Sequence, residues 1–439
     1  MKTNISVKSP QLTTHEGAPA KRINAEQQLR RSLMCCLLWE SGFYESGEDI
    51  AQRLADLVPL VKPEVVANLA IEAREKMKLR HAPLWIVRQM ALHDKHKTLV
   101  AQTLSRVIQR ADELAEFVAL YWKDKKQPLS AQVKKGLAKA FEKFSEYDLG
   151  KYNRDGAVKL RDVLFLSHGK PKDKEQEALW KRLIDGQLVI PDTWEVALST
   201  GKDKKETWER LMKERKLGAL ALLRNLRNMA EVGVDEAVIF SALDAMKVER
   251  VLPFRFISAA KYAPQWESHL EKAMLKCLSV REKLPGKTVL LIDVSGSMDS
   301  AISQKSDLRR YDAANGLAIL ARELCEKVAM YSFSDQLARV PDRHGFALRD
   351  AIANSQQHSS TYLGRAVETL NQNENYDRII VLTDEQVHDT VPNPKGKGYV
   401  INVAAYKNGV GYGAWTHIDG WSEAVFDYIA ESEKAEVVE

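Results

Sequence analysis

The sequence has 439 residues, of which 45% are hydrophobic and 28% are charged, a composition that excludes a largely disordered chain. A chain of this length predicts two or three domains. Residues 1–285 contain 50 Lys and Arg against 38 Asp and Glu, whereas residues 286–439 contain 15 against 22. The basic front favours a polyanionic partner, because Lys and Arg gain affinity by displacing the counterions of phosphates, although an excess of this size is also common among helical proteins.

The first 24 residues are mostly polar and predict a flexible N-terminal tail without a signal peptide or anchor. No later apolar stretch reaches the roughly 20 residues that cross a bilayer, so we expect no membrane span. The cysteines, Cys35, Cys36, Cys277 and Cys325, have no C-x-x-C spacing and no regular framework. They indicate neither a zinc site nor a disulfide scaffold, and they fit a reducing cytoplasm.

From residue 25 to residue 284 the apolar residues recur at helical spacing, and the alternation typical of strands is nearly absent. The breaks carry Pro, Gly or a helix-capping residue. Many short helices with brief connections predict helix pairs stacked into a solenoid rather than a four-helix bundle. The predicted helices are 27–39, 46–57, 62–76, 82–92, 97–108, 111–122, 130–143, 160–167, 174–186, 192–199, 204–215, 218–231, 234–245, 253–262 and 265–280.

The pattern changes at Leu284-Pro285-Gly286. Residues 288–294 form a nearly continuous apolar run rich in β-branched residues, which is typical of a strand buried on both faces of a parallel sheet. Strands and helices alternate after it, which predicts a doubly wound α/β domain over residues 285–439. The predicted elements are helix 311–327, strands 328–333 and 338–340, helices 346–355 and 363–371, strands 378–383 and 398–404, and helix 421–430.

Oxygen-bearing side chains follow the first strand of this domain. Asp293, Ser295 and Ser297 form a D-x-S-x-S pattern at its carboxyl end, where a tight turn can aim all three at one point. Thr361 precedes one predicted helix and Asp384 follows the strand 378–383, both on loops at the same edge of the sheet. Hydroxyl and carboxylate oxygens are hard ligands suited to Mg²⁺ or another divalent cation. The five residues therefore predict a divalent-metal site.

In type and order these residues resemble the metal-ion-dependent adhesion site of von Willebrand factor A domains. The resemblance implies that Ser295, Ser297 and Thr361 coordinate the metal directly, while Asp293 and Asp384 act largely through water. It also implies that an acidic group of a ligand completes the coordination. The alternative is a loop that maintains the fold and binds no metal.

Three stretches of the helical segment, 159–171 (KLRDVLFLSHGKP), 221–229 (ALLRNLRNM) and 250–256 (RVLPFRF), resemble the TROVE module of the Ro 60-kDa autoantigen family. That family joins the module to a C-terminal von Willebrand A domain. The resemblance covers nearly the whole chain from residue 25. It implies an α plus α/β fold class, with a ring of HEAT-like helical repeats closed by a doubly wound von Willebrand A-type domain.

The same resemblance implies RNA partners. The expected ligands are small noncoding Y-like RNA on the outer surface of the ring and the single-stranded 3′ ends of misfolded RNA in its central hole. The expected protein is a cytoplasmic monomer that acts, in bacteria, with an exoribonuclease.

The family's outer RNA contacts carry over onto Lys151, Arg154 and His168, where Arg154 requires a one-residue gap, and Lys170 follows in the same motif. Lys and Arg can pair with phosphates, and His can stack on a base or bond to its edge. The alternative for His168 is a capping or packing histidine in a turn.

Two further groups of basic residues have alternative readings. Arg224 and Arg227 share one face of an apolar helix, where they either line the ring's interior or pair with acids between repeats. A lysine-rich face either follows an RNA backbone or is simply solvated. Its residues are Lys123, Lys125, Lys126, Lys134, Lys135, Lys139 and Lys143.

No catalytic motif emerges from the sequence. It contains no G-x-S-x-G, no H-E-x-x-H and no phosphate-binding loop, and His93-x-x-His96 has no partners at metal spacing. The sequence therefore favours a non-enzymatic RNA-binding protein. The alternatives are a metal-dependent protein–protein adhesion module without RNA, and a metal-dependent RNase.

Overall fold

The computed structural model describes residues 12–20, 23–34, 47–153, 155–199, 203–247, 251, 253–278, 282–302, 308–404, 406, 409–410, 413–420 and 424–435. No helix in these ranges is long and apolar enough to cross a membrane. The chain divides into two compact units. The first contains residues 1–47, 218–231 and 240–439, and the second contains residues 48–217 and 232–239.

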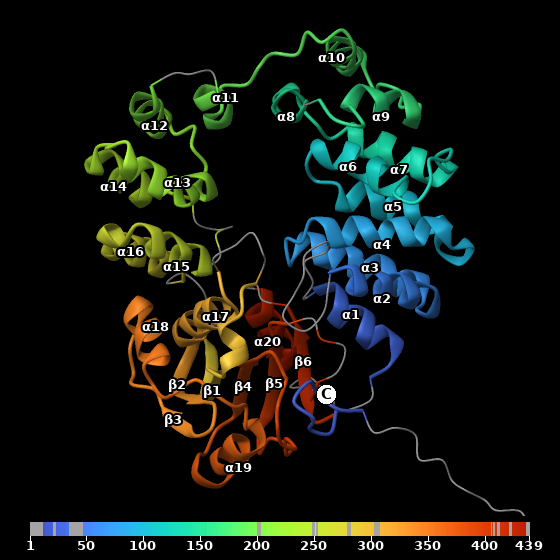
Figure 1. The fold of residues 1–439 in the computed structure, drawn as a ribbon. Coiled ribbons are helices and arrows are strands. Elements are labelled where there is room, and N and C mark those ends of the chain that lie inside the picture. Colours follow the sequence, from blue (N-terminus) through green and yellow to red (C-terminus); the bar gives the residue numbers. More distant parts are fainter. Residues whose placement is uncertain are drawn as a thin grey trace, which may run out of the picture. The chain divides into compact units, whose positions relative to one another are not determined.

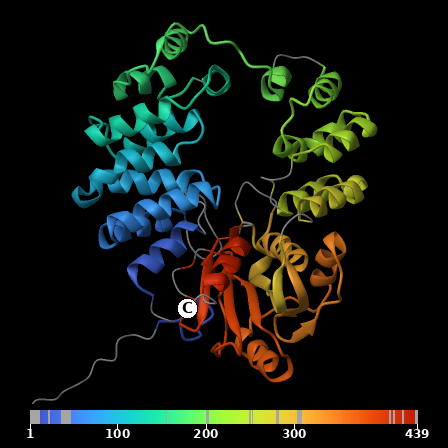
Figure 2. The same cartoon turned by 180° about the vertical axis from the view of Figure 1, so that it is seen from behind.

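The second unit is built from short helices, and those before residue 168 stack in two layers (Figures 1 and 2). They are α2 (Gly47–Leu57), α3 (Pro63–Glu75), α4 (His81–Leu92), α5 (Lys97–Val107), α6 (Asp112–Tyr121), α7 (Ala131–Phe141), α8 (Glu146–Tyr152), α9 (Leu160–Ser167), α10 (Lys174–Ile184), α11 (Trp194–Ser199) and α12 (Lys204–Lys213), with the 3-10 helices η1 (Val58–Leu60) and η2 (Asp94–His96). In one layer α3, α5, α7 and α9 contact one another in succession, and in the other α4 contacts α6. This stacking of helix pairs confirms the predicted solenoid.

Capping residues explain where several of these helices begin. The side chains of Ser130, Asp173 and Asp203 accept backbone N–H groups at the starts of α7, α10 and α12. Helix α8 was not among the predicted helices. Its start is a capping box in which Ser145 and Asp148 bond reciprocally to each other's backbone N–H groups. That spacing was the available signal for this helix.

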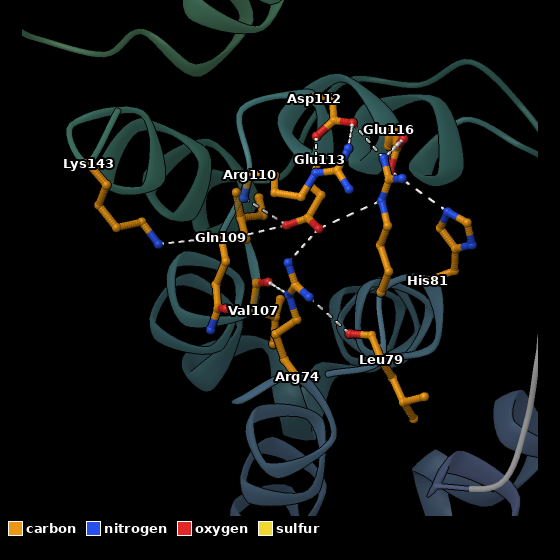
Figure 3. Close-up of polar contacts among 12 residues, drawn as sticks. Arg74, Leu79, His81, Val107, Gln109, Arg110, Asp112, Glu113, Glu116 and Lys143 are labelled. Atoms are coloured by element: carbon orange, nitrogen blue, oxygen red, sulfur yellow. Dashed lines mark hydrogen bonds and ion pairs between the residues drawn. The ribbon is translucent and has the colours of Figure 1, made fainter. Parts of the chain in front are cut away.

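A buried carboxylate joins three helices of this unit (Figure 3). Glu113 Oε1 accepts a bond from Arg74 Nη2 at 2.6 Å, and its Oε2 accepts the backbone N–H groups of Gln109 and Arg110 at 2.8 and 3.0 Å. Arg74 Nε also donates to the carbonyl of Val107, the last residue of α5, at 2.9 Å. Backbone groups at the end of α5 and before α6 are thus satisfied inside the unit.

Lys143 belongs to the same arrangement. Its ammonium donates to the carbonyl of Ile108 at 2.6 Å and also to that of Ser105, both near the C-terminal end of α5 (Figure 3). A cation in this position is favourable, because the last carbonyls of a helix carry partial negative charge. Lys143, one of the lysines of the predicted basic face, therefore stabilises the end of α5.

The first unit contains one six-stranded sheet in the order β3-β2-β1-β4-β5-β6, in which only the β2–β3 pair is antiparallel (Figure 1). The strands are β1 (Leu284–Asp293), β2 (Cys325–Phe333), β3 (Leu337–Arg339), β4 (Arg378–Thr383), β5 (Lys397–Asn402) and β6 (Trp415–Asp419). The predicted doubly wound domain is confirmed, and β6 is an addition to it.

The helices of the first unit come from both ends of the chain and from its middle. They are α1 (Ala25–Met34), α13 (Ala219–Glu231), α14 (Glu236–Asp244), which begins in the other unit, α15 (Pro253–Tyr262), η3 (Pro264–Trp266), α16 (Glu267–Leu278), η4 (Gly296–Asp299), α17 (Arg310–Leu324), α18 (Gly345–Ala353), α19 (Leu363–Asn373) and α20 (Ala424–Ala435). Strand β1 begins at the predicted boundary near residue 285. The compact unit nevertheless includes α1, α13, α15 and α16 as well.

The two faces of the sheet are covered by different helices. Val289 and Leu291 of β1 pack in one apolar cluster with Leu363 and Val367 of α19. Successive side chains of a strand alternate, so Leu290 and its neighbours face the other side. Helix α17 contacts β1, β2 and β4, and right-handed crossovers in opposite directions place α17 and α19 on opposite faces.

Part of the predicted N-terminal tail is bound to this unit. Thr13 and Pro19 form an antiparallel bridge, and Ala18 is buried in the apolar cluster that contains α19. The prediction of a flexible tail therefore does not hold for residues 12–20. Burial of an apolar side chain and paired backbone groups fix this segment.

Candidate functional site

The predicted metal ligands lie where the strand order of the sheet reverses. Asp293 is the last residue of β1, and Asp384 directly follows Thr383, the last residue of β4. The two strands are adjacent and parallel, with Ile292 opposite Leu382. The loops beyond the carboxyl ends of such strands form the usual ligand crevice of doubly wound sheets.

Asp293 is fully buried and is held by both carboxylate oxygens. Oδ1 accepts the Ser295 N–H at 2.9 Å, and Oδ2 accepts the Thr383 hydroxyl at 2.6 Å. The hydroxyl oxygens of Ser295 and Ser297 lie 3.2 Å apart. The turn thus brings the Ser295 and Ser297 hydroxyls together, and Asp293 is bonded to Thr383, a partner that the sequence pattern does not identify.

Electrostatics at this site favour a cation. Burial and the nearby Asp384 carboxylate raise the pKa of Asp293 to about 7, against bonds from Ser295 and Thr383 that lower it. Two buried carboxylates repel each other unless positive charge is supplied. Arg310, the first residue of α17, supplies one such charge, since its Nη1 lies 2.9 Å from Asp384 Oδ2. A divalent cation is a second means of neutralisation.

The loop that carries Thr361 is bonded to the other two ligand loops. The Gly296 N–H donates to the carbonyl of Ser359 at 2.9 Å. The Thr361 N–H donates to His388 Nδ1 at 3.1 Å, and the His388 N–H donates to the Thr361 carbonyl at 2.9 Å. Asp389 also accepts two N–H groups at the start of α19. All three predicted ligand loops therefore adjoin.

The donor set fits Mg²⁺ better than a softer metal. Among the described residues, no group of three or more His, Cys, Asp or Glu side chains is arranged to hold a metal ion. A metal at this site would therefore depend on the hydroxyls of Ser295, Ser297 and Thr361 with only two carboxylates. Mg²⁺ accepts such a shell, because it keeps several waters.

The candidate RNA contacts of the second unit lie on α8 and at the end of α9. Lys151 is partly exposed, with its ammonium 3.8 Å from Glu195 and 5.6 Å from the centre of the Tyr152 ring. The Arg110 guanidinium lies 4.8 Å from the same ring centre. Tyr152 thus has two cations beside its ring, and each of them also pairs with an acid, since Arg110 bonds to Asp112 at 2.7 Å. Arg154 lies outside the described residues.

His168 occupies an unusual backbone position. It ends α9 in the left-handed conformation, with φ of 53°, and its side chain is exposed. The alternative of a capping histidine is correct for the backbone of His168, because its N–H donates to the Phe165 carbonyl at 3.3 Å. The ring itself remains available for a ligand. Phe165, one turn earlier, exposes 58% of its surface, which is unusual for a large apolar side chain.

A basic loop follows His168. The side chains of Lys170, Lys172 and Lys174 are exposed, and the only acid among them, Asp173, caps α10. Within the described part of the chain, Lys170 has no ion-pair partner. Exposed aromatic rings next to uncompensated lysines are the combination that nucleic-acid surfaces use.

Arg224 and Arg227 lie on the exposed face of α13 in the first unit. Arg227 pairs with Glu231 of its own helix at 3.0 Å and lies 6.0 Å from the Tyr262 ring centre on α15. Burial and the positive charge of Arg224 lower the pKa of Arg255. Arg224 and Arg255 are therefore close enough to repel, and a bound phosphate would relieve that repulsion.

Comparisons with known proteins agree with this architecture. The family model of the TROVE domain matches residues 181–365, from α10 to α19. An alignment of 100 residues is 34% identical to Telomerase protein component 1 of Mus musculus. It covers 21% of this chain and only 4% of that protein.

Among solved structures, the chain is similar to the Ro (RSR) protein of Deinococcus radiodurans. The TM-score is 0.61 and the identity is 19%, over 92% of this chain and 98% of that one. The structural likeness gives the fold, and the domain match covers less than half of the chain. Residues 181–365 therefore match the TROVE domain, and the chain has the fold of the solved Ro protein.

Proposed function

We propose that this protein binds RNA without catalysing a reaction, and that it holds a small structured noncoding RNA of the Y-like class. The match of residues 181–365 to the TROVE domain supports an RNA-binding role. The single observation that carries the proposal is the exposed basic loop after His168, where Lys170 has no ion-pair partner within the described part of the chain. Release of phosphate counterions by such lysines supplies most of the affinity of nucleic-acid surfaces.

Different residues contact the phosphates and the bases of the RNA. Lys151 and Lys170 pair with phosphates and fix the position of the RNA. His168 and Phe165 offer faces on which an unstacked base of a loop or bulge can stack. Arg224 and Arg227 on α13 bind the single-stranded 3′ end of a misfolded RNA in the same proposal. The protein then acts as a cytoplasmic monomer in RNA quality control or processing, with an exoribonuclease as its partner.

The metal site has a separate part in this function. Bound Mg²⁺ would supply a Lewis-acidic position that captures a carboxylate of a protein partner. Ser295, Ser297 and Thr361 would hold the ion, and Asp293 and Asp384 would balance its charge. Hydroxyl-rich shells of this kind favour ligand capture over hydrolysis, for which several carboxylates normally surround two ions.

A filter-binding titration of the full chain with a small structured RNA tests RNA binding. We expect affinity to fall as salt rises from 50 to 200 mM. Replacing both Lys170 and Lys172 by Gln should weaken binding to all RNAs tested and reduce the slope of log K against log salt by about 2, roughly one per lysine. Lys272→Gln on α16 is the matched control. No binding at moderate salt, or binding without salt dependence, would contradict the proposal.

A further inference from the structure

The N-terminal part of the chain contacts every residue of a four-residue segment in the loop that follows β4. Residues 385–388 come directly after the candidate ligand Asp384, and each of them is bonded to a residue between 14 and 31. The four contacts are Arg31 Nη1 to Glu385 Oε2 at 2.5 Å, His15 N–H to Gln386 Oε1 at 2.7 Å, Thr14 hydroxyl to Val387 O at 2.7 Å, and His388 Nε2 to Glu16 Oε2 at 3.2 Å.

Residues 12–20 form a folded turn, which we call the N-terminal strap. The Thr14 N–H donates to the Ala18 carbonyl at 2.9 Å, and the Thr14 hydroxyl accepts the Ala18 N–H at 3.1 Å. Gly17 has φ of +88°, which a residue with a side chain rarely adopts. Ala18 is buried in the core of the sheet. The strap is thus shaped by its own bonds and anchored by an apolar contact.

The strap reaches both distal ligands of the metal site through one intervening residue each. Gln386, which the His15 N–H contacts, donates its own N–H to Asp384 Oδ1 at 3.3 Å and its Nε2 to the Asp384 carbonyl at 3.1 Å. His388, which Glu16 contacts, accepts the Thr361 N–H on Nδ1. Since Nδ1 is an acceptor, the neutral ring carries its proton on Nε2 and donates it to Glu16.

A second contact comes from α1. Arg31 is 1% exposed, Glu385 is fully buried, and Arg31 Nε also donates to the Tyr406 carbonyl at 2.6 Å. Glu385 itself has positive φ, 62°, a conformation that costs energy for a residue other than Gly and persists only where its surroundings impose it. The bond from Arg31 is part of those surroundings.

We propose that the N-terminal strap and Arg31 position the loops of Asp384 and Thr361, so that the divalent-metal affinity of the α/β domain depends on residues at the other end of the sequence. The inference rests on the metal site proposed above. Outer partners that orient metal ligands typically contribute 10- to 100-fold to metal affinity. Here those partners would be Thr14, His15, Glu16 and Arg31.

Thr14→Val combined with Glu16→Ala in the full chain tests the proposal. The first change keeps the shape and removes the hydroxyl that bonds to the Val387 carbonyl and to the Ala18 N–H, and the second removes the partner of His388. Glu26→Ala is the control, because Glu26 is exposed in the first turn of α1 and belongs to the same N-terminal part of the chain. Mn²⁺ affinity is measured by electron paramagnetic resonance, and hydrogen exchange is followed in peptides that cover 359–363 and 384–389.

The expected result is a Mn²⁺ affinity at least 10-fold weaker in the double variant than in the wild type and the control. Exchange should also be faster in both peptides, with or without metal, because His388, the acceptor of the Thr361 N–H, loses its partner Glu16, and the Val387 carbonyl loses its donor Thr14. If the wild type binds Mn²⁺ and the double variant has the same Mn²⁺ affinity and the same exchange rates, the proposed role of the strap is wrong and the metal site stands. Absence of Mn²⁺ binding in the wild type would overturn the metal site, and the inference with it.

Discussion

Arg310 Nη1 lies 2.9 Å from Asp384 Oδ2, and both side chains are buried. This guanidinium stands beside the carboxylate that the sequence assigns to a metal site. The protein therefore has an internal positive charge that offsets the charge of Asp384. The Arg310 guanidinium and a divalent metal ion would both neutralise Asp384, and replacing Arg310 tests this.

Arg310→Gln should lower the free energy of unfolding by about 3 to 5 kcal/mol without divalent metal, because Asp384 then keeps a buried charge without its partner. Mg²⁺ should raise the melting temperature of this variant more than that of the wild type. Arg309→Gln is the neighbouring control, since its pair with Asp299 is exposed. Equal effects of Mg²⁺ on all three proteins in differential scanning calorimetry would argue against a metal at this site.

The second prediction concerns Glu113 in the helical unit. Glu113→Ala leaves the buried Arg74 guanidinium without its carboxylate and two backbone N–H groups without an acceptor, at a cost of about 3 to 5 kcal/mol. Glu75→Ala breaks an exposed pair with Arg106 and should cost less than about 1 kcal/mol. Urea unfolding followed by circular dichroism measures both. Similar losses for the two variants would show that the buried network is not a main support of this unit.

The third prediction is a pH dependence at the edge strand β6. His417 Nδ1 lies 2.7 Å from Glu385 Oε1, and Nε2 lies 2.7 Å from Asp419 Oδ1. Burial alone would lower the pKa of His417, but Asp419 and Glu385 raise it from 6.5 to about 9. The folded-state pKa exceeds the unfolded one, so this contribution to stability is complete below pH 6.5 and is lost as pH rises through 9.

Wild-type stability should therefore fall between pH 6.5 and 9 by on the order of 1 to 3 kcal/mol more than that of His417→Gln, which has no proton to lose. The measurement is the free energy of unfolding at a series of pH values. Parallel profiles for the two proteins would mean that the ring is neutral in the folded state.

The fourth prediction separates the two functional parts of the molecule. Asp293→Ala removes a buried carboxylate of the metal site, in the unit that does not contain Lys151 or His168. The variant should lose Mn²⁺ binding and keep its affinity for a small structured RNA within about twofold, provided its circular dichroism spectrum is unchanged. A large loss of RNA affinity in the folded variant would link the two parts.

Periodicity predicted most of the fold, because apolar residues recur regularly along these helices and strands. The failures have local causes. Helix 311–327 was predicted to run into β2, whose first residues, Cys325 to Lys327, include two good helix formers, Glu326 and Lys327. The side chains of His417 and Asp419 on strand β6 are buried. Because these residues are polar, the sequence of β6 does not show the apolar pattern of a buried strand.

Most of the candidate ligands were predicted from their place after strand ends, and Thr361 from its place before a helix. The sequence predicts the positions of Asp293, Ser295 and Asp384, because the carboxyl ends of parallel strands share one edge of a sheet. Arg310 and the partners supplied by the N-terminal strap are set by contacts between segments up to 373 residues apart. No local pattern in a single sequence reports such pairings. The polar composition of residues 1–24 favours a tail, and only packing shows that Ala18 is anchored.

Sequencing the small RNAs that copurify with the full chain tests the central claim most directly. The account predicts that one or a few small structured RNAs are enriched over their share of total cellular RNA, and that Lys170→Gln with Lys172→Gln reduces this enrichment while Lys272→Gln does not. A copurifying pool that matches total RNA, or that is unchanged in the double variant, would contradict it.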